Sequence, residues 1–219
     1  MSTRAQLRTK LRTEIKIDPN GKVWNDTTLD QFINSAYFQV QKDGNFNWRE
    51  NDGNYSFSLT SGTQEYTLPT GFIRTDLVRY AGTELFPTSK VDLKRIYSSF
   101  VNGTPSRYYI NGGFIWLDVI PNVTGTLDID YRKQLTAFTS DSDNSSFPET
   151  MDDVMTKYGA YLAWSTTKGN EQTAQLKLAD YKQELETMIG GFIFDIGNPR
   201  FSTSRVMRSI TRPDVLDRR

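Results

Sequence analysis

The sequence contains no cysteine and no histidine among its 219 residues. Without cysteine there is no disulfide framework, no thiol nucleophile and no thiolate metal ligand. Without histidine the commonest general base and the commonest zinc ligand are missing, which excludes histidine-based catalytic triads and the familiar zinc sites. An enzyme made from this chain would have to work with Asp, Glu, Lys, Ser or Tyr.

Long apolar runs are absent as well. No stretch approaches the run of about 20 apolar residues that spans a bilayer, and the N-terminus has no apolar signal-peptide core. We therefore expect a soluble protein that is not exported by a signal peptide and has no membrane partner. The length and a composition of 37% hydrophobic and 24% charged residues are typical of one globular domain with a sizeable core, or of two small ones.

The formal net charge of zero hides an uneven distribution. Residues 1–16 carry a charge of +4, residues 200–219 also carry +4, and residues 17–199 carry −8. Such asymmetry predicts basic termini that dock on acidic partners.

Helical periodicity occurs at both ends of the chain. A short amphipathic helix is predicted within residues 3–16, and a second helix, capped by Asp26 or Thr27, closes near Gly44. Pro148 opens a third helix, and a fourth runs from about Glu171 to Ile189, where Gly190-Gly191 ends the regular structure. The apolar positions that carry these predictions are Leu7, Leu11, Ile15; Leu29, Phe32, Ile33, Ala36, Tyr37, Val40; Val154, Met155, Tyr158, Tyr161, Leu162, Trp164; and Ala174, Leu178, Tyr181, Leu185, Met188, Ile189.

Between the helices, residues 54–133 alternate between apolar and polar positions with tight-turn residues between the runs. The Gly112-Gly113 turn suits a two-residue hairpin. In the last predicted strand Leu127, Ile129 and Tyr131 face one way, and Asp128, Asp130 and Arg132 face the other.

These patterns predict an α+β fold in which a helical bundle contains an inserted antiparallel β-module, a small sandwich or barrel, followed by an extended C-terminal arm. The predicted divisions are 1–50 for the N-terminal helices, 54–133 for the β-module, 148–190 for a C-terminal helical hairpin and 191–219 for the arm.

Two acidic groups are candidates for catalytic or metal sites. Asp128 and Asp130 could form a carboxylate pair, but a solvated strand face is the plainer interpretation. Asp141, Asp143, Ser145 and Asp152 resemble the oxygen spacing of a calcium loop, yet Ser146 stands where that loop needs glycine and Pro148 falls inside it, which favours a polar linker. We therefore predict no catalytic residue, no metal and no cofactor.

Two groups of residues are predicted to bind partners. Arg4, Arg8 and Arg12 lie four apart on one helix face, where they could contact a partner's carboxylates or DNA phosphates or remain a solvated face. The arm is too apolar for a plain linker, so we predict that it orders on a neighbouring chain. Its candidate contact residues are Phe192, Phe194, Arg200, Phe201, Arg205, Arg208 and Arg212.

Over roughly residues 20–190 the chain resembles the head-to-tail adaptor (connector or neck) proteins of tailed bacteriophages, in the class with a β-module inserted in a helical domain. The residues that carry the resemblance are Trp24-Asn25-Asp26, Leu29, Phe32-Ile33-Asn34-Ser35-Ala36, Tyr66-x-Leu68-Pro69, Gly103-Thr104-Pro105, Tyr108-Tyr109, Ile120-Pro121 and Tyr131-Arg132.

The resemblance implies a non-enzymatic virion protein, made in the host cytoplasm and placed in the neck between capsid and tail. It implies a ring of this chain, usually of twelve copies, that joins the portal protein to a tail or nozzle protein. DNA would pass through the axial channel without sequence-specific contacts. An alternative from a different class is a virion protein whose aromatic-rich β-module binds a glycan or a receptor.

Overall fold

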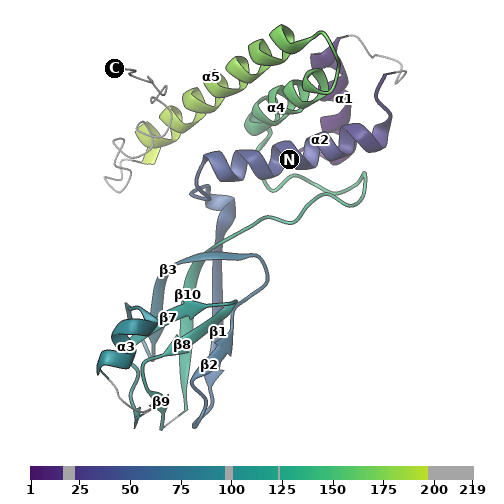
Figure 1. The fold of residues 1–219 in the computed structure, drawn as a ribbon. Coiled ribbons are helices and arrows are strands. Elements are labelled where there is room, and N and C mark those ends of the chain that lie inside the picture. The colour runs from purple at the N-terminus through teal and green to yellow at the C-terminus, as the bar shows by residue number, and fades with distance from the viewer. Residues whose placement is uncertain (17–22, 97–100, 123, 197–219) are drawn as a thin grey trace, which may run out of the picture.

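The computed structural model describes residues 1–16, 23–96, 101–122 and 124–196. Figure 1 shows two bodies joined by a narrow neck: a helical bundle and a β-module. Helices from both ends of the chain form the bundle, so the β-module is an insertion between them, and the predicted α+β class is confirmed.

The bundle contains four long helices, and α4 packs against the other three. The N-terminus of α1 is closed by a capping box, in which the Thr3 hydroxyl accepts from the Gln6 amide and the Gln6 side chain accepts from the Thr3 amide. The N-cap of the second helix is Asn25 rather than the predicted Asp26 or Thr27, and its side chain accepts from the Thr28 amide at 2.8 Å. The helices are α1 (Arg4–Ile15), α2 (Asp26–Asp43), α4 (Asp152–Ser165) and α5 (Glu171–Ile196), with a 3-10 turn at Glu149–Met151 leading into α4.

The apolar stripes of these helices meet in one core. Leu7, Leu11 and Ile15 of α1 are buried with the stripe of α2, as the i, i+4 spacing predicted. Phe147 from the segment before α4 is also fully buried, and its ring lies 5.3 Å from that of Tyr37.

The β-module contains two four-stranded sheets. One has the order β1-β10-β3-β4 and is antiparallel, and the other has the order β2-β8-β7-β5, in which β5 joins β7 in parallel. A short parallel pair, β6-β9, lies beside them, so the module is mainly but not wholly antiparallel. The elements are a 3-10 turn at Arg49–Asn51, β1 (Asp52–Leu59), β2 (Glu65–Thr67), β3 (Phe72–Tyr80), β4 (Thr83–Glu84), β5 (Phe86–Pro87), α3 (Lys90–Ile96), β6 (Asn102–Gly103), β7 (Arg107–Asn111), β8 (Phe114–Leu117), β9 (Ile120–Pro121) and β10 (Gly125–Lys133).

The inner faces of the two four-stranded sheets bury a second core, separate from that of the bundle. Leu127 and Ile129 of β10 pack with Ile115 and Leu117 of β8, and all four are fully buried. The module is therefore a small sandwich rather than a closed barrel.

The end of α5 differs from the prediction. The helix does not stop at Ile189 but continues through Gly190 and Gly191 to Ile196. A glycine costs about 1 kcal/mol relative to alanine inside a helix but does not interrupt its hydrogen bonds, so the pair permits an end without requiring one. The beginning of the predicted extended arm is thus helical, and residues 197–219 lie outside the described residues.

Candidate assembly surfaces

The three arginines of α1 are held by carboxylates of the same chain. Arg8 donates two hydrogen bonds of 2.8 Å to Asp30, and Arg4 lies 2.7 Å from Asp141. Arg12 contacts Asp26 at 2.7 Å. The arginine side chains are only 13–18% exposed.

This network joins α1 to α2 and to the connector that leads into α4. The hydrogen bond from Arg8 to Asp30, the largest contribution, raises the pKa of Arg8. Hydrogen bonds from Arg8 and then Arg4 lower the pKa of Asp141. As placed, the arginine face predicted to contact a partner or DNA is largely neutralised inside the bundle.

Each acidic residue that resembled a calcium loop has its own hydrogen-bond partners. Asp141 binds the arginines, and Asp143 accepts from the amides of Thr139 and Ser140 at 2.6 and 2.8 Å. Asp152 is fully buried, where its Oδ2 accepts from Lys10 and from Ser2 at 2.5 Å each. Across the described part of the chain, no cluster of three or more acidic side chains has metal-binding geometry.

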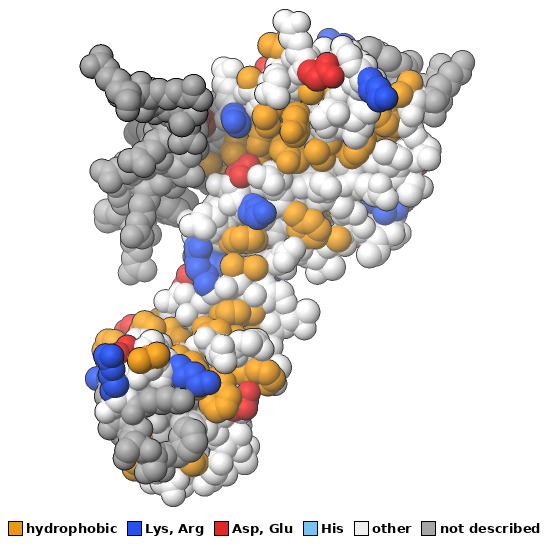
Figure 2. All heavy atoms as spheres, in the orientation of Figure 1, with side chains coloured by type: hydrophobic (Ala, Val, Ile, Leu, Met, Phe, Trp, Pro, Cys, Tyr) orange, Lys and Arg blue, Asp and Glu red, His pale blue; other side chains and the backbone are white. Residues whose placement is uncertain are grey.

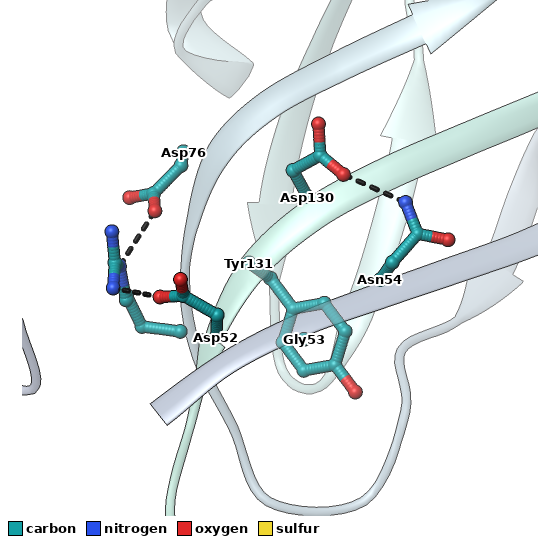
Figure 3. A pocket seen from close by; sticks show the side chains of 7 residues that line it. Asp52, Gly53, Asn54, Asp76, Asp130 and Tyr131 are labelled. Atoms are coloured by element: carbon teal, nitrogen blue, oxygen red, sulfur yellow. Dashed lines mark hydrogen bonds and ion pairs between the residues drawn. The ribbon is translucent and has the colours of Figure 1, made fainter. Parts of the chain in front are cut away.

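A shallow cavity of about 390 Å³ lies where the β-module meets the neck, and Figure 3 shows its lining. Arg132 forms ion pairs there with Asp52 and, at 2.6 Å, with Asp76. Gly53 is needed beneath the Tyr131 ring, because a Cβ at that position would lie 2.7 Å from the ring. Asp130 also lines the cavity, so three carboxylates surround one guanidinium and the cavity is a polar, net acidic hollow.

Asp128 and Asp130 lie on the outer face of β10, as the alternation predicted, while Leu127, Ile129 and Tyr131 are buried. Asp128 accepts from the Ser56 hydroxyl, and Asp130 accepts from the Asn54 amide at 2.7 Å. These cross-strand pairs hold β1 to β10, and the solvated strand face is the interpretation that fits them.

The polar residues that join the two bodies were missed by the sequence analysis. Gln41 and Asn51 are both fully buried, and the Gln41 side-chain oxygen accepts from the Leu135 amide at 2.8 Å. Asn51 donates to the Lys133 carbonyl at 2.8 Å and to Gln41 at 3.3 Å. The available signal was a polar residue at the next apolar position of the α2 stripe, four residues after Tyr37.

The predicted arm residues are only partly covered by the structure. The backbone of Phe192 and Phe194 belongs to the last turns of α5. The others, Arg200, Phe201, Arg205, Arg208 and Arg212, lie outside the described residues.

Two further surfaces of the β-module are exposed: the outer faces of its two four-stranded sheets. The outer face of the β2-β8-β7-β5 sheet carries Tyr109 and Trp116, whose rings stack with centroids 5.8 Å apart and planes 12° apart. Phe86 at the edge of this sheet is 63% exposed.

Of the helices in the described ranges, none is long and apolar enough to cross a membrane.

The geometry defines the class of the protein: a helical bundle that carries an inserted β-sandwich on a narrow neck. Comparison with known families then identifies it more closely. The SU10 adaptor protein family matches residues 2–209, and the chain belongs to that family. It is therefore an adaptor-type structural component of a phage virion, which confirms the predicted resemblance at that level. A search of curated proteins found no match.

Proposed function

We propose that the protein is a head-to-tail adaptor that forms a ring between the portal and the tail of the virion. The observation that carries the proposal is the family match over residues 2–209, which includes the bundle, the β-module and the first part of the arm. In this proposal the ring occupies the neck of the particle, contacts the portal above and a tail or nozzle protein below, and leaves an axial channel through which DNA passes.

The arm after α5 is the proposed portal-binding segment. Residues 200–219 carry a charge of +4, and Arg200, Arg205 and Arg208 alternate with apolar residues. A basic, partly apolar segment that orders on a partner can combine ion pairs with buried apolar contacts.

Truncation after Ile196 tests the arm, because it leaves α5 at its full described length. We expect the truncated protein to keep its thermal unfolding transition but to lose binding to its portal, measured by co-sedimentation. Replacing the four arginines at positions 200, 205, 208 and 212 with glutamine should weaken binding in the same direction and make it less salt-dependent. Lys168→Gln, an exposed position in the α4–α5 turn, is the matched control.

Unchanged portal binding by the truncated chain would show that the arm is not the contact. Ring formation is tested separately by the mass of the full chain, alone and mixed with its portal, in native mass spectrometry. A chain that remains monomeric and unbound in both samples would rule out the ring adaptor.

A further inference from the structure

The outer face of the β2-β8-β7-β5 sheet, here called the aromatic face, is unusually apolar for an exposed sheet. Because Ile115 and Leu117 are buried, Phe114 and Trp116 project outward. Trp116 lies between Glu65 on one neighbouring strand and Tyr109 on the other. Phe86 extends the face at the β5 edge.

The aromatic face also carries one residue of each charge, Arg107 on β7 and Glu65 on β2. Arg107 is exposed on the same side of β7 as Tyr109, and among the described residues no carboxylate pairs with it. The Thr88 amide donates to the Tyr108 carbonyl at the β5 edge of the sheet. Helix α3 begins two residues later, at Lys90, and therefore starts near the same edge. In Figure 2 hydrophobic side chains on the β-module lie next to both basic and acidic ones.

The outer face of the β1-β10-β3-β4 sheet, here called the acidic face, carries three acidic residues around Arg79. Asp128 and Asp130 project from β10, and Glu84 lies across from Arg79 at the β4 edge. Asp130 and Arg79 are 3.6 Å apart and about 40% exposed each, so this pair is weak and solvated. Asp128 accepts from the Ser56 hydroxyl and lies opposite Arg79 in the β10–β3 ladder, but among the described residues Arg79 pairs with Asp130 and not with Asp128.

The two faces point in opposite directions. Their inner sides share the core of the sandwich, so the outer sides lie on opposite surfaces of one small body. A head-to-tail contact between copies requires two different, complementary surfaces on opposite sides of the subunit. Repeating the contact gives a closed ring when the rotation from one copy to the next divides a full turn evenly.

We propose that the aromatic face of one copy packs on the acidic face of the next copy, with Arg107 of the first placed against Asp128 of the second. This inference rests on the proposed ring adaptor and identifies the surfaces through which its β-modules meet. Charge complementarity favours a second copy as the occupant, because each chain carries both partners of the contact. Burial of Phe86 and Phe114 against the neighbour would add apolar stabilisation at the centre of the contact.

Charge reversal tests the contact. Arg107→Glu and Asp128→Lys should each lower self-association at least tenfold, measured by analytical ultracentrifugation with and without the portal, since each places like charges opposite one another. An equimolar mixture of the two variants should assemble in alternation. At one contact the introduced glutamate then meets the introduced lysine, and at the next the native Arg107 meets the native Asp128. Lys168→Glu, a reversal to negative charge on an exposed turn of the bundle, should leave association unchanged.

Cross-linking supplies a second measurement that does not depend on affinity. The chain has no cysteine, so Arg107→Cys and Ser56→Cys each introduce a single thiol. Ser56 lies across from Asp128 on the acidic face. A short bismaleimide should join the two variants to each other in a mixture, whereas neither variant alone should give a cross-linked dimer.

The outcomes separate this inference from the proposed function. The face-to-face contact is overturned if rings form normally with either reversed charge, or if Arg107→Cys alone gives a cross-linked dimer. Neither result would contradict the proposed ring adaptor. A chain that never associates, with or without the portal, overturns both. Calorimetric binding of an oligosaccharide panel that Trp116→Ala abolishes would make a glycan the occupant of the aromatic face and overturn the inference.

Discussion

The bundle and the β-module satisfy their charged groups in different ways. In the bundle the arginines of α1 are mostly buried, and each contacts an acidic residue outside its own helix. In the β-module the charged side chains lie on outer sheet faces, where Arg107 and Glu84 have no ion pair among the described residues. The bundle therefore uses its charges to hold itself together, whereas the module leaves charges available for another surface. Four changes would break or sharpen this contrast.

The largest effect is expected from Phe147→Ala, because this fully buried ring packs against Tyr37 and Trp48 in the bundle core. The loss of packing should lower the free energy of unfolding of the bundle by about 3–5 kcal/mol. Hydrogen exchange should rise in α2 and α4 and stay unchanged in β8 and β10. The exposed Phe86→Ala is the control and should stay within about 0.5 kcal/mol. Equal loss of protection in both bodies would show that they unfold as one unit.

Asn51→Ala should have the next largest effect, because it removes hydrogen bonds at the neck and leaves the Lys133 carbonyl without its donor. A cost of about 1–3 kcal/mol is expected in chemical denaturation, with faster exchange of the Leu135 amide. Asn54→Ala removes an exposed side chain that bonds Asp130, and should cost less than half as much. A smaller effect at Asn51 than at Asn54 would contradict the role of the Asn51 hydrogen bonds in joining the two bodies.

The bundle should also lose stability in alkali through Tyr181. Burial, followed by the hydrogen bond to Asp43 at 2.5 Å, raises the pKa of Tyr181 above its ordinary value. Since the folded state holds this proton more tightly than the unfolded state, the stabilisation is complete below the unfolded pKa of about 10 and declines as the pH rises above it. Tyr181→Phe should cost about 1 kcal/mol at neutral pH but flatten the decline, measured as unfolding midpoints between pH 8 and pH 11. An unchanged slope would contradict this assignment.

The smallest effect on stability is expected from Asp128→Asn, which keeps an acceptor for Ser56 on an outer strand face. The free energy of unfolding should change by no more than about 0.5 kcal/mol, and no hydrolytic activity should depend on this residue. A hydrolase activity in the wild-type protein that disappears in this variant would reopen the carboxylate-pair interpretation.

The elements that the sequence predicts well are those whose burial repeats with a regular period. The α2 stripe and the β10 alternation each bury one face, so the spacing of Leu29, Ile33, Leu127 and Ile129 carries the information locally. Asp141 shows why the rest was missed: its arginine partners lie 133 and 137 residues away in the sequence, and no local pattern joins them. Gly190 and Gly191 are a different case. Two glycines often end a helix, but here the helix continues through both of them.

The site predictions divide in the same way. Side-chain direction on β10 followed from alternation, whereas the pairing of Tyr109 with Trp116 depends on the register between β7 and β8. The two-residue Gly112-Gly113 turn sets that register, and its positive φ angles of 62° and 86° agree with the hairpin turn that the sequence predicts. No local pattern predicts that β2 pairs with the other edge of β8.

The insertion leaves and re-enters the bundle at a single point. Asp52 at the start of β1 pairs directly with Arg132 near the end of β10, so the two crossing strands are neighbours in one ladder. Residues directly opposite in such a ladder have Cα atoms about 5 Å apart, a gap that a tight turn of a few residues can close. A short turn or another domain could therefore replace the β-module while the two chain ends at the bundle keep their present separation.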